Sequence, residues 1–147
     1  MSAKATIVKK MEFEAAHFLP ESSYQGPCNS VHGHSYKILV AITGKIDPST
    51  GMVIDFSILK RAVKTCINEL DHKLLNDIIC NPTAENIVLW IWKHMVKYDL
   101  MKTSTWYRIS YVELWETSSC SCVIKREHIE DLIGEWKLEY SREKDEC

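Results

Sequence analysis

Three histidines in the N-terminal part of the chain have the residue type and the spacing of a metal site. His32 and His34 are separated only by Gly33, and on an extended chain residues i and i+2 point to the same side, so both imidazoles can reach one ion. The glycine would also allow a close backbone approach. His17 ends an earlier segment, and antiparallel pairing of the two segments could bring its ring alongside. Three imidazoles with one open position form a catalytic zinc arrangement, whereas two surface histidines near a turn are the alternative.

A cysteine and an Asp-His pair could add proton transfer to such a centre. Cys28 lies four residues before His32, where its thiol could be a fourth ligand, a base or nucleophile with a pKa lowered by the cation, or a buried loop cysteine. Asp71 precedes His72 directly, and a carboxylate that orients an imidazole gives a proton-transfer pair if the two meet, across a subunit contact in one arrangement. The alternative is a histidine that stabilises the end of a helix.

A glutamate follows the aromatic segment near residue 110. Glu116 is adjacent to Thr117, and a carboxylate there can accept two hydrogen bonds from a guanidine-like ring edge. The alternative is an exposed glutamate at the end of a strand.

The composition excludes several classes of protein. The 147 residues fit one domain spanning 1–147, and 46% hydrophobic with 26% charged residues is ordinary for a globular protein. The net charge of −2 gives no bias toward nucleic acid or anionic membranes. No apolar run approaches the roughly 18–20 residues of a membrane span. We therefore expect neither a nucleic-acid nor a membrane partner.

The cysteines and the start of the chain predict a cytoplasmic location. The first ten residues lack the apolar region of a signal peptide, so the six cysteines are expected to stay reduced. None of them forms a Cys-x-x-Cys pair, which argues against a zinc ribbon or a dithiol redox site.

The hydrophobic pattern predicts an α+β fold. Residues 5–18, 35–46, 105–116 and 121–125 alternate as strands, with a long loop at 19–33. Apolar residues recur at helical spacing after Asp55, a helix N-cap, and again after Thr83, on the positions Ile87, Ile91, Met95 and Tyr98. Residues 127–147 form a charge-rich C-terminal extension with weak helical character. The order strand, strand, helix, helix, strand, strand indicates an antiparallel sheet with two helices on one face, whose uncovered edges favour oligomerisation through strands.

Six motifs between Phe13 and Val123 resemble the 6-pyruvoyltetrahydropterin synthase superfamily, and more closely its 6-carboxytetrahydropterin synthase branch of queuosine (7-deazaguanine) biosynthesis. The three-residue gap between Cys28 and His32 is like that branch. The motifs are Phe13-Glu14-Ala15-Ala16-His17, Cys28-x-x-x-His32-Gly33-His34-Ser35, Asp47-Pro48-x-x-Gly51-Met52-Val53-Ile54-Asp55-Phe56, Leu70-Asp71-His72-x-x-Leu75-Asn76, Asn81-Pro82-Thr83-x-Glu85-Asn86 and Glu116-Thr117.

This resemblance implies a tunnelling fold, in which trimers stack into a homohexamer and the sheets close into an oligomeric barrel. It implies that Zn²⁺ is the cofactor and that the substrate is a small-molecule pterin. The implied residue roles are zinc ligands for His17, His32 and His34, a catalytic thiol for Cys28, a proton-transfer pair for Asp71 and His72, and pterin binding for Glu116 and Thr117.

The implied reaction converts 7,8-dihydroneopterin triphosphate to 6-carboxy-5,6,7,8-tetrahydropterin, acetaldehyde and triphosphate. The alternatives are a 6-pyruvoyl-forming synthase, a relative that cleaves another pterin side chain, and a zinc-containing pterin- or purine-binding protein without activity. Two features depart from the family pattern. Residues 11–36 contain no lysine or arginine, and Phe18 stands where relatives often have a basic residue. Pro27 and Asn29 flank Cys28 where bacterial relatives tend to have other residues.

Overall fold

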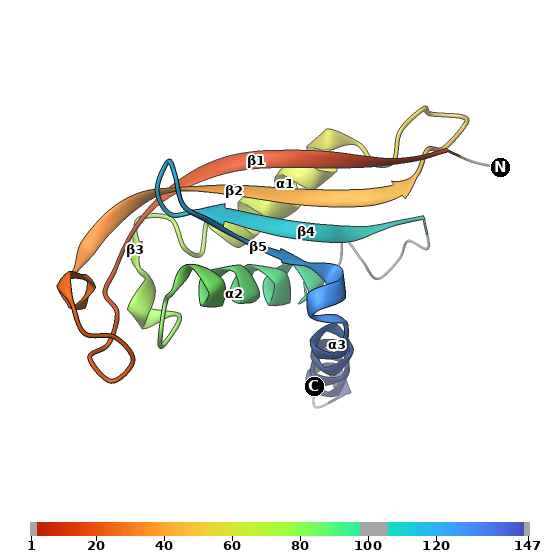
Figure 1. The fold of residues 1–147 in the computed structure, drawn as a ribbon. Coiled ribbons are helices and arrows are strands. Elements are labelled where there is room, and N and C mark those ends of the chain that lie inside the picture. Colours follow the sequence, from red (N-terminus) through yellow and green to blue (C-terminus); the bar gives the residue numbers. More distant parts are fainter. Residues whose placement is uncertain (1–2, 98–105, 146–147) are drawn as a thin grey trace.

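A five-stranded sheet organises the computed structural model, which describes residues 3–97 and 106–145 (Figure 1). The strand order is β3-β1-β2-β4-β5, and each neighbouring pair is antiparallel except for a short parallel contact of β3 with β1. The strands are β1 (Lys4–His17), β2 (His32–Lys45), β3 (Lys73–Leu74), β4 (Tyr107–Trp115) and β5 (Ser121–Lys125).

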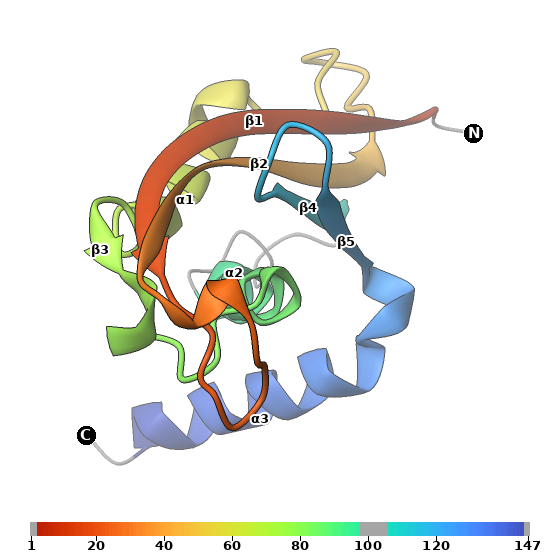
Figure 2. The same cartoon turned by 60° about the vertical axis from the view of Figure 1, so that its left-hand side comes forward.

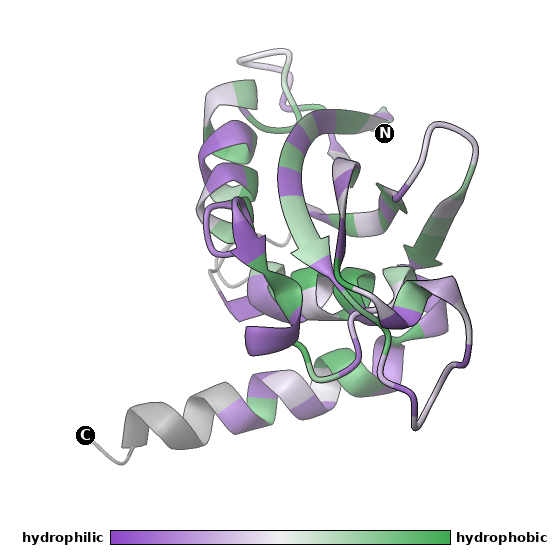
Figure 3. Ribbon diagram, turned by 90° about the vertical axis from the view of Figure 1, so that its left-hand side faces the viewer, coloured by the Kyte–Doolittle hydropathy of each residue, from purple (hydrophilic) through white to green (hydrophobic). Residues whose placement is uncertain are grey.

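Helices α1 (Phe56–Ile67) and α2 (Ala84–Lys97) pack on one face of this sheet. Asp55 caps α1, because its carboxylate accepts a hydrogen bond from the Ser57 backbone N–H at 2.7 Å. A third helix, α3 (Glu130–Asp145), runs along the side of α2 that faces away from the sheet (Figure 2). Hydrophobic and hydrophilic bands alternate along β1 and α1 (Figure 3), as expected for elements with one buried side. The described helices are too short or too polar to cross a bilayer.

The predicted fold class is confirmed, including the two helices on one face and the helical C-terminal extension. Three residues of that extension, Ile129, Ile133 and Trp136, are buried in the core. The sequence pattern missed β3 because a strand of two residues has no periodicity. Three residues used in the predictions, Tyr98, Thr105 and Cys147, lie outside the described residues.

The long pairing of β1 with β2 brings the predicted histidines together. The register runs without interruption from Lys4 opposite Lys45 to His17 opposite His32. Strand β2 therefore begins at His32, three residues before the predicted start, since each added pair continues the hydrogen-bonded ladder. The core face of both strands ends in histidines, which places the site where the sheet leaves the hydrophobic core.

Candidate active site

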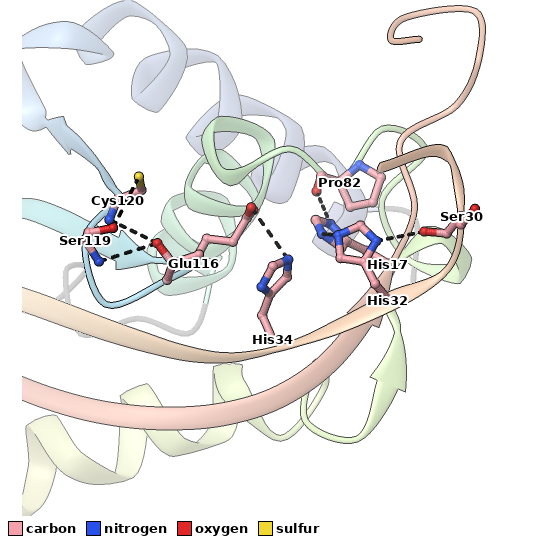
Figure 4. A network of polar contacts seen from close by, with 9 residues as sticks. His17, Ser30, His32, His34, Pro82, Glu116, Ser119 and Cys120 are labelled. Carbon is pink, nitrogen blue, oxygen red and sulfur yellow. Dashed lines mark hydrogen bonds and ion pairs between the residues drawn. The ribbon is translucent and has the colours of Figure 1, made fainter. Parts of the chain in front are cut away.

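The side chains of His17, His32 and His34 converge at the end of the β1–β2 pair (Figure 4). One ring nitrogen from each lies within 4.8 Å of the others. The ring of His17 lies 4.6 Å from that of His32 and 5.0 Å from that of His34, between centroids. His17 lies opposite His32 in the strand pair and His34 is two residues further along β2, so all three side chains share one face. The structure therefore brings the predicted ligand set together.

Hydrogen bonds to backbone carbonyls orient two of these rings. The Nδ1–H of His17 donates to the Pro82 carbonyl oxygen at 2.8 Å, and that of His32 donates to the Ser30 oxygen at 2.7 Å. A carbonyl oxygen can only accept, so each neutral ring keeps its proton on Nδ1 and leaves an Nε2 lone pair. A carbonyl or carboxylate behind the second nitrogen is the common support of a metal-bound histidine.

The chemistry of these nitrogens fits a metal ion. The Nε2 atoms of His17 and His32 lie 3.1 Å apart with lone pairs facing, an arrangement that a shared cation stabilises. Two nitrogens on one tetrahedral zinc are about 3.3 Å apart. The Nε2 of His34 is buried and has no hydrogen-bond partner among the described residues. Three protein nitrogens with no fourth ligand in the group leave room for a substrate atom.

The local environment favours the uncharged form of the third ligand. Burial lowers the pKa of the His34 imidazole, and the opposite effect of the Glu116 carboxylate does not compensate for it. The distance of 3.6 Å from His34 Nε2 to Glu116 Oε1 is therefore a dipolar contact at neutral pH. Neutral imidazoles are the form that binds metals.

Acidification is expected to destabilise the metal-free protein between about pH 7 and pH 5. The pKa values of both His34 and His94 lie below the unfolded value because of burial, so the unfolded state binds more protons as the pH falls through this range. Asp71 and the other carboxyls with lowered pKa values lose their contribution only below about pH 4. Thermal unfolding after chelation, followed from pH 7.5 downward, measures this. A melting temperature that is constant or rises over the interval would contradict it.

Glu116 directly follows β4, and its carboxylate faces His34 of the neighbouring strand β2. Its backbone N–H donates to the Cys120 carbonyl oxygen at 3.2 Å, which fixes the turn into β5. Thr117 has a structural role in the same turn, because its hydroxyl oxygen accepts the backbone N–H of Ser119 at 3.4 Å and of Cys120 at 3.2 Å. Apart from its 3.6 Å contact with His34, the Glu116 carboxylate can accept donors from a ligand. The predicted binding roles of Glu116 and Thr117 stay predictions.

A buried tyrosine lies beneath the site and was not singled out from the sequence. The ring of Tyr36 stacks on that of Phe13 at 4.9 Å and lies 5.4 Å from that of His34. Its hydroxyl is buried without a partner among the described residues. Burial raises the pKa of this phenol, so it is neutral over the whole physiological range. It gives the metal group a rigid apolar base.

Cys28 lies in a short 3₁₀ turn, Pro27–Asn29, of the loop between β1 and β2. Its sulfur is not part of the three-histidine group, and its carbonyl oxygen accepts the Leu19 N–H at 2.8 Å. The Asn29 side chain holds the turn by donating to the carbonyl oxygens of Leu19 at 2.7 Å and Tyr24 at 2.8 Å. Asn29, noted in the sequence only as a departure from relatives, is thus the residue that shapes the cysteine loop.

The predicted Asp71–His72 pair forms. His72 Nδ1 lies 3.0 Å from Asp71 Oδ1, and the same oxygen accepts the Glu14 N–H at 2.9 Å, which lowers the pKa of the Asp71 carboxyl. The backbone of His72 has a positive φ of 58°, and its side chain is 77% exposed. The imidazole is therefore largely exposed to solvent, beside the short strand β3.

Asn76, to which the sequence analysis assigned no role, holds the end of β1. The Asn76 side chain accepts the Phe18 N–H at 2.9 Å and donates to the Phe18 carbonyl oxygen at 2.8 Å. These two bonds hold the residue that follows His17. The Leu75-Asn76 motif was a signal in the sequence, but its contact with Phe18 could only be read from the structure.

Two cavities reach His34 of the metal group. One of about 500 Å³ connects His34 to His72 along the β1 edge, and one of about 700 Å³ connects His34 to Glu116. Gly33 lines both of them. A Cβ at Gly33 would meet no atom closer than the Ala15 carbonyl oxygen at 3.6 Å, so the expected close backbone approach is wrong.

Comparisons with known proteins agree with this geometry. The family model described as 6-pyruvoyl tetrahydropterin synthase matches residues 6–127. A dihydroneopterin monophosphate aldolase of Pyrococcus furiosus is 41% identical over 88 residues, which are 60% of this chain and 72% of the relative. A 6-carboxy-5,6,7,8-tetrahydropterin synthase of Synechocystis is 41% identical over 92 residues, 58% of this chain and 70% of the relative.

Solved structures lead to the same family. The 6-pyruvoyl tetrahydropterin synthase of Caenorhabditis elegans superimposes with a TM-score of 0.74 at 25% identity. The match covers 84% of this chain and 96% of that one. With the family model spanning most of the sequence, the chain belongs to the 6-pyruvoyl tetrahydropterin synthase family.

Proposed function

We propose that this protein is a zinc-dependent lyase that converts 7,8-dihydroneopterin triphosphate and water to 6-carboxy-5,6,7,8-tetrahydropterin, acetaldehyde and triphosphate. The observation that carries the proposal is the three-histidine group with an open position beside the Glu116 carboxylate. A structural metal site would be closed by a fourth protein ligand. The named relative from Synechocystis supports the choice of product.

His17, His32 and His34 would hold the ion, which as a Lewis acid would acidify the substrate C–H next to a bound oxygen. The hydrogen bonds of His17 and His32 to Pro82 and Ser30 keep their donor nitrogens turned toward the ion. The Tyr36 ring beneath them excludes water from that side of the group.

Glu116 would bind the pterin ring through its carboxylate. The 2-amino group and the adjacent ring N–H of a pterin form a donor pair that matches the two oxygens of a carboxylate. Rings without those donors would leave a half-buried carboxylate unpaired, which gives selectivity. The carboxylate lies 3.6 Å from His34 Nε2, so a ring bound there would place its C6 side chain near the metal group.

Cys28 and the Asp71–His72 pair would move protons at the side chain. The Cys28 thiol would exchange protons on one face of the substrate. His72, oriented by Asp71 at 3.0 Å, would serve the other face. Because its side chain is largely exposed, we propose that it acts in a neighbouring subunit of a homohexamer, a dimer of trimers.

We also propose that the protein works in the cytoplasm, where its cysteines stay reduced. Its product would enter queuosine or another 7-deazapurine pathway. One observation favours a second candidate, cleavage of a less phosphorylated pterin: the relative from Pyrococcus furiosus is named a dihydroneopterin monophosphate aldolase. The three-residue gap between Cys28 and His32 favours the first candidate.

Product analysis tests the proposal. The zinc-loaded protein is incubated with 7,8-dihydroneopterin triphosphate, and the products are identified by mass spectrometry. We expect 6-carboxytetrahydropterin together with acetaldehyde and triphosphate. A 6-pyruvoyl product, or turnover only of the monophosphate, would replace this function with one of the alternatives. Pterin binding without any turnover would indicate a binding protein.

A further inference from the structure

The proposed substrate carries a chain of phosphates, and the chain segments that build the metal group supply no cation for it. Residues 11–36 contain neither lysine nor arginine, and Phe18 follows the first metal-site histidine. Acidic residues are common at the site: Glu14 lines one cavity, while Glu113 and Glu116 line the other. A polyanion therefore needs cations that come from elsewhere in the fold.

The larger cavity provides two of them. It extends from Gly33, His34 and Glu116 over the sheet face opposite the helices, and its lining includes Lys10 and Lys37. Lys10 belongs to β1, where it pairs with Leu39, and Lys37 belongs to β2, where it pairs with Trp115. Both lysines point to the same face because alternate positions of paired strands share a side. Two ammonium groups thus line a groove that also reaches His34 and Glu116, whose side chains project from the helix-covered side of the sheet.

The existing contacts of the two lysines would not prevent them from binding a new anion. The Nζ of Lys37 lies 3.7 Å from Glu12 Oε1, with the two side chains 43% and 61% exposed. An exposed pair at this distance contributes little stability, so exchange of Glu12 for a phosphate oxygen costs little. Lys10 is exposed on the same face, and its partner on β2, Leu39, is two residues from Lys37. A phosphate carries more charge than one carboxylate and would attract both lysines.

We propose that Lys10 and Lys37 form the phosphate subsite, so that the substrate lies along the groove with its ring at Glu116 and its phosphate chain over β1 and β2. This inference rests on the proposed function. It accounts for the absence of a basic residue at Phe18, because the phosphates leave the metal group over the open sheet face rather than along the loop after β1. It also makes phosphate number, read by these lysines, a determinant of substrate choice.

The test compares two ligands that differ only in phosphate. Affinities for 7,8-dihydroneopterin triphosphate and for unphosphorylated 7,8-dihydroneopterin are measured by quenching of tryptophan fluorescence. All variants are zinc-loaded and carry Cys28→Ala to prevent turnover. Lys10→Gln combined with Lys37→Gln is expected to weaken the triphosphate by about tenfold or more and to leave the unphosphorylated pterin unchanged. Raising the salt concentration should weaken only the triphosphate, and less so in the double variant.

Lys9→Gln is the matched control. It lies next to Lys10, removes the same charge and points to the other face of β1, so it should change neither affinity by more than about twofold. Equal weakening of both ligands in the double variant, or of neither, would overturn the phosphate subsite. A parent protein that binds neither pterin would instead overturn the proposed function. Loss of triphosphate affinity in Lys9→Gln would show a general charge effect and also overturn the subsite.

Discussion

The His34→Ala variant is expected to bind zinc at least about a hundredfold more weakly than the parent protein and to lose turnover with it. Removal of a partner behind a metal-bound histidine already costs about 10–100-fold in affinity, and loss of the ligand itself costs more. The Nε2 of His34 is buried and has no hydrogen-bond partner among the described residues, which leaves it available as a ligand. Zinc content after dialysis and the zinc dissociation constant measure the effect.

The fold should survive this substitution, because the metal group lies beyond the hydrophobic core and the Tyr36–Phe13 stack beneath it is unchanged. His128→Ala is the matched control: it removes an exposed imidazole in the 3₁₀ turn Arg126–His128 and should leave one zinc per chain. Full zinc binding by His34→Ala would contradict the three-histidine site. Loss of zinc in both variants would indicate binding at scattered surface histidines.

The second large effect is expected at Cys28. Cys28→Ala should retain zinc and pterin binding and lose about a hundredfold to ten-thousandfold in kcat, the usual contribution of a positioned acid or base. The sulfur lies outside the group of ring nitrogens that would bind the ion, so its removal leaves the ligands intact. The surrounding turn should persist as well, because Asn29 holds it through the carbonyl oxygens of Leu19 and Tyr24.

Cys80→Ala controls for nonspecific effects of removing a thiol, since this residue is an exposed free cysteine whose sulfur is not part of the three-histidine group. Single-turnover kinetics, zinc content and pterin affinity are measured on all three proteins. If Cys28→Ala loses zinc, the thiol is a fourth ligand and its assignment as the proton-transfer group is wrong. If it turns over normally, the protons at the side chain come from another group.

Much of the site could be predicted because its residues are local in sequence or follow a strand period. His32 and His34 share a face in any extended segment, and the hydrophobic alternation of β1 placed His17 on that same face. The α1 cap at Asp55 was also local, since an acidic N-cap needs only the N–H groups that follow it.

Other features depend on contacts between distant segments. Glu116 approaches His34 only because β2 and β4 pair in one register, and a bulge between Ala41 and Ile42 shifts that register. Sequence spacing carries no information on such a shift. The role of Asn76 likewise depends on a backbone contact with Phe18 that spans 58 positions. The cavity lined by Lys10 and Lys37 likewise depends on the pairing of three strands, β1, β2 and β4.

Zinc K-edge X-ray absorption of the loaded protein tests the central claim, an open metal centre made of three histidines, most directly. We expect three imidazole nitrogens at about 2.0–2.1 Å and no sulfur at about 2.3 Å. The Cys28→Ala variant is expected to give the same spectrum. A sulfur shell in the parent that disappears in the variant would contradict the account, because the centre would then be closed by the cysteine that is proposed to transfer protons.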